Sequence, residues 1–229
     1  MQRHLLHFAL TSLLALLVLP AWAAPVINPD PKRFAKEIAA FDAQDKAQPP
    51  RKGGIVFTGS SSIRLWDLKA AFPQAGALNR GFGGSQISDV NHFLEETTLR
   101  YEPAQVIFFC GANDLWAGKP VEQVLEDYRS FTKRLFDRLP KTQLIVMGVK
   151  PSPARLRIIE TERKMNTLLR AEAKKDARVI FLGETFDVML DASGQPREEL
   201  YVKDRLHLSP AGYTLWNKLL APHLKSEKP

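Results

Sequence analysis

Short apolar runs without alternating polar residues constrain this chain more than any other feature. Five such runs follow one another, separated by segments with helical periodicity, at residues 55–57, 77–78, 106–109, 144–147 and 179–182. A strand that is apolar at consecutive positions is buried on both faces of its sheet. Strands of this kind, separated by helices, form a parallel sheet covered by helices on both sides.

The segments around these runs predict the helices. Apolar residues recur at helical spacing over 34–41 until two prolines at 49–50 end the pattern. Ser209 and Pro210 supply an N-cap and a first-turn proline to a last helix that runs through Leu220. We therefore predict a three-layer α/β/α sandwich with a five-stranded parallel sheet, doubly wound as in flavodoxin. Further helices are expected over residues 63–72, 87–99, 121–139 and 155–174.

The composition fits one globular domain whose core is built by packing alone. Of the 229 residues, 45% are hydrophobic and 25% are charged, which is typical of a globular protein. The single cysteine, Cys110, cannot form a disulfide framework, and its place at the end of an apolar run predicts a small buried side chain. The sequence contains neither an internal repeat nor an interdomain linker, so we expect residues 24–229 to form one domain.

The first 23 residues predict a secretory signal peptide. Arg3 precedes an apolar stretch at 8–19, and Ala21-Trp22-Ala23 is an A-x-A cleavage site. The alternative is a retained membrane anchor, but the stretch is shorter than the roughly 20 residues that span a bilayer. We expect an exported protein, periplasmic or secreted, without stable membrane insertion. Export and the scattered Lys and Arg residues, despite a net charge of +7, argue against nucleic acid as a partner.

Polar residues follow three of the predicted strands at the edge where such sheets bind ligands. Ser60-Ser61-Ser62 comes after the first strand and offers either a nucleophile or a helix cap. Gly84 lies after the second strand and offers a backbone amide or a tight turn. Asn113 follows the third strand and offers a side-chain donor or an Asx turn.

One histidine stands out from the others of the predicted mature chain. His92 falls inside a predicted helix, and His223 falls in the polar tail. Only His207 has a carboxylate three residues before it in a predicted loop, at Asp204. That spacing lets the carboxylate accept from one ring nitrogen while the other faces a hydroxyl.

Taken together, these segments resemble the SGNH hydrolases, the GDSL esterase and lipase superfamily, over essentially the whole predicted mature domain. The resemblance implies Ser61 as nucleophile, His207 as base and Asp204 as the acid of the triad. It also implies an oxyanion hole made by the amides of Ser61 and Gly84 and the side chain of Asn113. One departure is Ser60, which stands where the family usually has Asp. The matching blocks are residues 59–63, 79–85, 111–114 and 204–207.

The resemblance implies hydrolysis of carboxylic esters through an acyl-enzyme intermediate. A short-chain or acetyl ester on a carbohydrate and a lysophospholipid are both compatible substrates, and Trp116 is a candidate contact for either. Trp66 is expected in the core. Transfer of the acyl group to an acceptor other than water stays open, as does a non-catalytic glycan- or lipid-binding module. No phosphate-loop or His-Glu-x-x-His motif occurs, so we expect neither cofactor nor metal.

Overall fold

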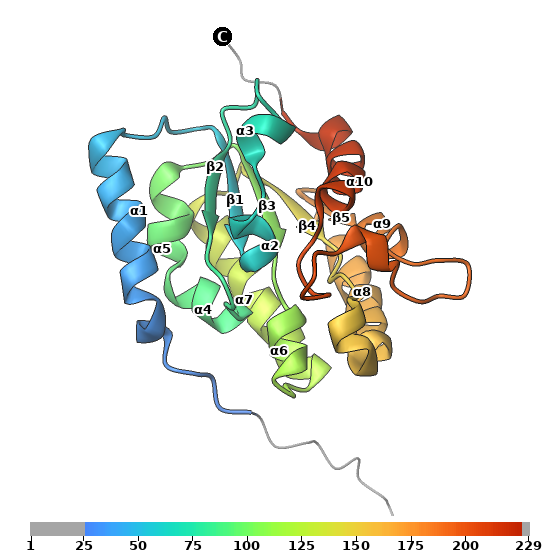
Figure 1. Cartoon of the computed structure of the whole chain (residues 1–229). Coiled ribbons are helices and arrows are strands. Elements are labelled where there is room, and N and C mark those ends of the chain that lie inside the picture. The colour runs from blue at the N-terminus through green and yellow to red at the C-terminus, as the bar shows by residue number, and fades with distance from the viewer. Residues whose placement is uncertain (1–25, 226–229) are drawn as a thin grey trace, which may run out of the picture.

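The computed structural model describes residues 26–225, so the predicted signal peptide lies outside the described residues. Within them, five parallel strands form one sheet in the order β2-β1-β3-β4-β5 (Figure 1). This is the flavodoxin-like order, and it confirms the predicted fold class. The predicted apolar runs lie in the strands, except that Ala77 stands just before the second one. The strands are β1 (Ile55–Gly59), β2 (Leu78–Gly81), β3 (Gln105–Phe109), β4 (Gln143–Met147) and β5 (Val179–Leu182).

Helices cover both faces of the sheet, as the unbroken apolar strands predict. In β3, Val106 and Phe108 pack into one core, whereas Ile107 and Phe109 pack into the other. Figure 1 shows α1 and α10 on opposite sides of the sheet. The first core contains residues of α1 (Ala35–Ala47), α4 (Ile87–His92), α5 (Leu94–Thr97), α6 (Ala112–Trp116), α7 (Val121–Arg138) and α8 (Ile159–Ala173). The second contains residues of α2 (Ser61–Arg64), α3 (Leu68–Ala71) and α10 (Pro210–Leu220), together with Met189 just after α9 (Glu184–Asp187).

A tryptophan cluster fixes α10 against the turn that follows β1. The rings of Trp66 and Trp216 lie 5.5 Å apart, and Trp216 also packs 5.1 Å from Phe109. The indole N–H of Trp66 donates to Asn217 on α10 over 2.9 Å. Trp66 is therefore a core residue, as predicted, and its contacts determine where the loop before α10 lies.

Some predicted helices are interrupted. Residues 63–72 form two short helices, because the side chain of Asp67 caps a new helix by accepting from the amide of Ala70. Residues 87–99 are likewise divided at Phe93, between α4 and α5. The segment Pro153–Ile158 is a 3-10 helix in which Arg155 is non-helical, so α8 begins only at Ile159. Further 3-10 segments are Pro31–Phe34, Leu99–Tyr101, Glu198–Leu200 and Ala221–His223.

Cys110 lies just beyond the end of β3 and is buried, as predicted. Burial raises the pKa of its thiol well above the ordinary value. A thiol in this environment stays protonated, and the protonated form is a poor nucleophile. The side chain therefore acts as a small core residue.

Candidate active site

Ser61 stands at the turn between β1 and α2. The turn requires Gly59, whose φ is +131° and where an added Cβ would lie 2.0 Å from the carbonyl oxygen of Phe109. Ser60 and Ser62 are buried, with 4% and 3% of their surface exposed, whereas Ser61 is only partly buried. Of the three serines, Ser61 is therefore the one whose hydroxyl is placed for chemistry.

His207 links Ser61 to Asp204. Its Nε2 lies 3.0 Å from the hydroxyl oxygen of Ser61, and its Nδ1 lies 2.6 Å from Oδ2 of Asp204. The other oxygen of Asp204 accepts from the amides of Leu206 and His207. Partial desolvation opposes ionisation, but these hydrogen bonds, the His207 ring first, lower the pKa of Asp204 to about 2. The three predicted residues thus form one hydrogen-bonded chain with an ionised carboxylate at its end.

The loop that carries Asp204 and His207 is held from the segment after β4. Lys150 Nζ donates to the carbonyl of Leu206 over 2.6 Å, and the amide of Ala154 donates to Arg205 over 3.0 Å. Burial lowers the pKa of Lys150 to about 8 and raises that of the nearby Glu162 to about 8. Within the described residues, neither carboxylate oxygen of Glu162 has a hydrogen-bond partner. The support beneath the site is therefore a buried cluster of ionisable side chains.

The predicted oxyanion donors line one pocket with Ser61 and His207. Gly84 has φ +82°, and no atom lies within 4 Å of the place where a Cβ would stand, so the backbone there borders open space. Asn113 lies on α6 rather than in a loop. The pocket has a volume of about 300 Å³, and its charged lining residues are Glu37, Arg64 and Arg155.

The side-chain amide of Asn113 is oriented by one hydrogen-bond acceptor and one hydrogen-bond donor. Its Nδ2 donates to the carbonyl of Ser85 over 2.9 Å, and its Oδ1 accepts from Arg155 over 3.0 Å. A carbonyl only accepts and a guanidinium only donates, so this pairing fixes which way the amide points. Arg155 also donates to the carbonyl of Ala112 over 3.2 Å. One N–H of Asn113 remains for a ligand in the pocket.

Asp114, the residue after Asn113, anchors α6. It is fully buried, and its carboxylate accepts from the backbone amide of Ile87 at 3.2 Å and from Lys119 at 3.0 Å. These contacts tie α6 to the start of α4. Asp114 thus holds the helix that presents Asn113.

Arg155 and Lys150 were not identified by the sequence reasoning. Both follow β4, at the same edge of the sheet as the residues that follow β1, β2 and β3. The rule that ligands bind at the carboxyl ends of the strands covers this position equally. The signal that could have found them is a pair of cations in the proline-rich segment directly after the fourth apolar run.

Trp116, the candidate substrate contact, does not line the Ser61 pocket. It ends α6 rather than lying in a loop, and 36% of its surface is exposed. The guanidinium groups of Arg157 and Arg155 lie 3.9 Å and 5.3 Å from the centre of its ring. In the structure, the Trp116 ring therefore packs against these two arginines instead of facing the Ser61 pocket.

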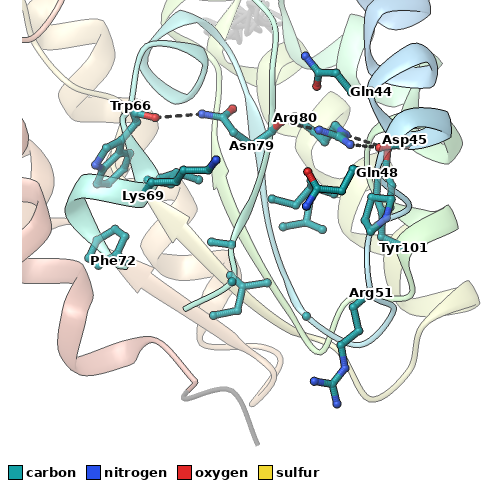
Figure 2. Close-up of a pocket in the computed structure, with 18 of the residues that line it drawn as sticks. Gln44, Asp45, Gln48, Arg51, Trp66, Lys69, Phe72, Asn79, Arg80 and Tyr101 are labelled. Carbon is teal, nitrogen blue, oxygen red and sulfur yellow. Dashed lines mark hydrogen bonds and ion pairs between the residues drawn. The ribbon is translucent and has the colours of Figure 1, made fainter. Parts of the chain in front are cut away.

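A second, larger groove lies along the edge strand β2, away from Ser61. It has a volume of about 890 Å³, and none of the predicted site residues lines it. Figure 2 shows Arg80 paired with Asp45 on one wall and Asn79 bonded to the backbone of Trp66 on the other. Arg80 also donates to Tyr101 over 2.8 Å. These polar groups already satisfy one another, so the groove does not replace the Ser61 pocket as the candidate site.

Metal-binding clusters and membrane-spanning helices are both absent from residues 26–225. No group of three or more His, Cys, Asp or Glu side chains in this part of the chain is arranged to hold a metal ion. No helix in the same range combines the length and the apolar character needed to cross a membrane.

The sequence model of the GDSL-like lipase/acylhydrolase family matches residues 61–215, which is more than half of the chain. The chain belongs to this family. The match begins at Ser61 and includes Asn113, Asp204 and His207. Membership confirms the resemblance identified from the sequence, and it implies an ester hydrolase acting on an ester substrate.

Solved structures of similar fold include three bacterial proteins. A Streptococcus pneumonia protein named after platelet activating factor superposes with a TM-score of 0.75 at 23% identity, covering 84% of this chain and 94% of its own. A GDSL-like lipase from Bacteroides thetaiotaomicron superposes with a TM-score of 0.68 at 22% sequence identity, and the match covers 85% of this chain and 97% of the lipase. A catalytic mutant of an acetylxylan esterase from Geobacillus stearothermophilus superposes with a TM-score of 0.60 at 16% sequence identity, and the match covers 77% of this chain and 96% of the esterase. At these identities the likeness shows the fold alone. No curated protein matches the chain.

Proposed function

We propose that the protein is a serine esterase in which Ser61 is the nucleophile. The observation that carries this proposal is the hydrogen-bonded chain from Asp204 through His207 to Ser61. His207 takes the proton of Ser61 as the hydroxyl oxygen attacks the ester carbonyl. The ionised Asp204 orients the ring and stabilises the imidazolium that forms.

The same residues complete the reaction. The tetrahedral intermediate places its negative oxygen near the amides of Ser61 and Gly84 and the free N–H of Asn113. The intermediate collapses when the bond to the leaving alcohol breaks and His207 protonates that oxygen. Water then attacks the acyl-enzyme with His207 again as base, and the acid product leaves with Ser61 restored.

The pocket at Ser61 supports a short acyl group. Its volume of about 300 Å³ holds the reacting centre as well as the acyl part, and charged residues line it. An acetyl or other short-chain ester fits this space better than a long acyl chain does. On the sequence of residues 1–23 we further propose that the enzyme acts after export, as a single domain over residues 24–229.

The first test is labelling with a fluorophosphonate, followed by peptide mapping and assay with nitrophenyl acetate. We expect one adduct, on Ser61, and turnover of the acetate. Ser61→Ala loses both, whereas Ser60→Ala and Ser62→Ala serve as matched controls and keep the adduct on the Ser61 peptide.

An adduct on Ser60 or Ser62 contradicts the assignment of the nucleophile. A folded protein that neither labels nor turns over any ester supports the binding-module alternative. Product analysis with a sugar alcohol present separates hydrolysis from acyl transfer, since only transfer yields a new ester.

A further inference from the structure

An apolar groove of about 580 Å³ adjoins the Ser61 pocket at His207. His207 lines both spaces, whereas Gly84 and Asn113 line only the Ser61 pocket. The groove runs between the α2–α3 region, the segment 202–208 and α10. The groove therefore borders the reacting centre at the base, His207, and not at the oxyanion donors.

Exposed apolar side chains form the walls of this groove. Leu65 and Val202 are 45% and 42% exposed, and they come from segments far apart in the chain. Single exposed apolar residues are ordinary on a protein surface. Leu65 and Val202, however, line one groove beside the candidate base. Together they form an apolar binding surface.

Each polar side chain that lines the groove makes at least one hydrogen bond within the protein, and Asp204 makes its own with His207. Asp67 accepts from the amide of Ala70, Asn217 accepts from Trp66, and the hydroxyl of Tyr213 donates to the carbonyl of Ser62 over 2.9 Å. A sugar needs partners for each of its hydroxyls when water is removed from them. The groove therefore suits an alkyl or aryl group better than a carbohydrate.

The chemistry decides which part of an ester extends toward the groove. His207 must protonate the oxygen of the leaving alcohol, so that oxygen lies within hydrogen-bond reach of Nε2. The carbonyl oxygen lies on the other side, at Gly84 and Asn113. The alcohol part therefore leaves the reacting centre past His207, where the groove begins.

We infer that the groove binds the alcohol part of the substrate and that this part is an alkyl or aryl group. The inference rests on the proposed esterase activity. It assigns the two sides of the site to different parts of the ester: a short acyl group in the charged pocket, and an apolar alcohol along Leu65 and Val202.

Two ester series test this assignment. One series joins acetate to straight-chain alcohols from ethanol to octanol, and the other joins ethanol to acids from acetate to octanoate. We expect kcat/KM to rise about two- to fourfold per methylene along the alcohol series, through KM, until the groove is filled. The acid series should show no such rise.

Variants locate the effect. Leu65→Ser and Val202→Ser should lower the gain per methylene in the alcohol series to below about 1.5-fold. Leu156→Ser is the matched control, because Leu156 is 42% exposed but does not line the groove, and it should keep the wild-type gain. The gain is a ratio taken within one variant, so a general loss of folded enzyme cancels.

An alcohol series without a rise, or a rise in the acid series that Leu65→Ser removes, overturns the inference. Binding of 1-octanol to the Ser61→Ala variant, followed by tryptophan fluorescence, tests the groove without turnover. We expect binding about tenfold weaker once Leu65→Ser is added, and equal binding overturns the assignment. Loss of labelling and turnover in the wild type refutes the esterase instead, and octanol binding still decides whether the groove takes an apolar alcohol.

Discussion

The guanidinium of Arg155 holds the side-chain oxygen of Asn113 at 3.0 Å, although the residues are 42 positions apart. Because the carbonyl of Ser85 holds the amide nitrogen, Arg155 determines the remaining rotation of the Asn113 side chain. The positive charge of the guanidinium beside Oδ1 also polarises the amide and makes its free N–H a stronger donor. In the proposed esterase, Arg155 is therefore a positioning residue that acts through Asn113.

Substitution of Arg155 should lower kcat and leave KM nearly unchanged. We expect Arg155→Ala to lose about 10- to 100-fold in kcat, less than the roughly 10²- to 10³-fold expected for Asn113→Ala. Arg157→Ala is the control, because Arg157 lies over the same Trp116 ring, and it should retain wild-type kcat. In the Asn113→Ala background, Arg155→Ala should have no further effect. Losses that multiply in the double variant would show that Arg155 acts independently of Asn113.

The ionised state of Asp204 predicts a specific pH profile. Its hydrogen bonds hold the pKa of Asp204 at about 2, so the carboxylate stays charged well below neutral pH. In the pH profile of kcat, Asp204 should therefore contribute no titration of its own between about pH 5 and pH 9. We expect a loss on the order of 10⁴-fold for Asp204→Asn and a larger one, on the order of 10⁶-fold, for His207→Ala. An NMR carboxyl signal of Asp204 that titrates within this range would contradict the prediction.

Two glycines at the site should respond differently to alanine. At Gly59 an added Cβ would meet the carbonyl of Phe109 at 2.0 Å, so Gly59→Ala should fail to fold. At Gly84 the space is open and only the positive φ is strained, at a cost of about 1–2 kcal/mol. Gly84→Ala should fold and lose kcat, because the strain moves the backbone amide. Calorimetry and assay of the two variants check this, and a stable, fully active Gly59→Ala would contradict it.

Glu162 should make stability fall as the pH rises. Burial raises its pKa in the folded protein to about 8, from 4.5, so the folded state keeps a proton that the unfolded state releases. Stability from this group is complete below about pH 4.5 and is lost as the pH rises toward 8. Glu162→Gln should remove this pH dependence. In the wild type, the dependence should lower the free energy of unfolding by on the order of 2–4 kcal/mol between about pH 4.5 and pH 8. Equal slopes of unfolding free energy against pH in both proteins would refute the prediction.

The sheet could be predicted because its signal is local. Each strand is a run of consecutive apolar residues, and burial on both faces needs no knowledge of distant contacts. The last helix was predicted for the same reason, since Ser209 caps it by accepting from the amide of Gly212. The breaks at Asp67 and Phe93 were missed because a side-chain cap or a kink overrides apolar spacing without changing it.

Three features follow from the amino-acid order alone: the succession of strands and helices, the edge at which polar residues gather, and the 204–207 spacing that pairs a carboxylate with a histidine. Which of these residues come into contact depends on tertiary packing. Ser61 and His207 are 146 positions apart and come together because Trp66 and Trp216 pack α10 against the turn after β1. Arg155 reaches Asn113 because the segment after β4 lies beside α6, and the apolar groove forms where residues 65–71 meet residues 202–217 beside His207. Such contacts depend on how helices and loops pack over the sheet, and local propensity does not encode that packing.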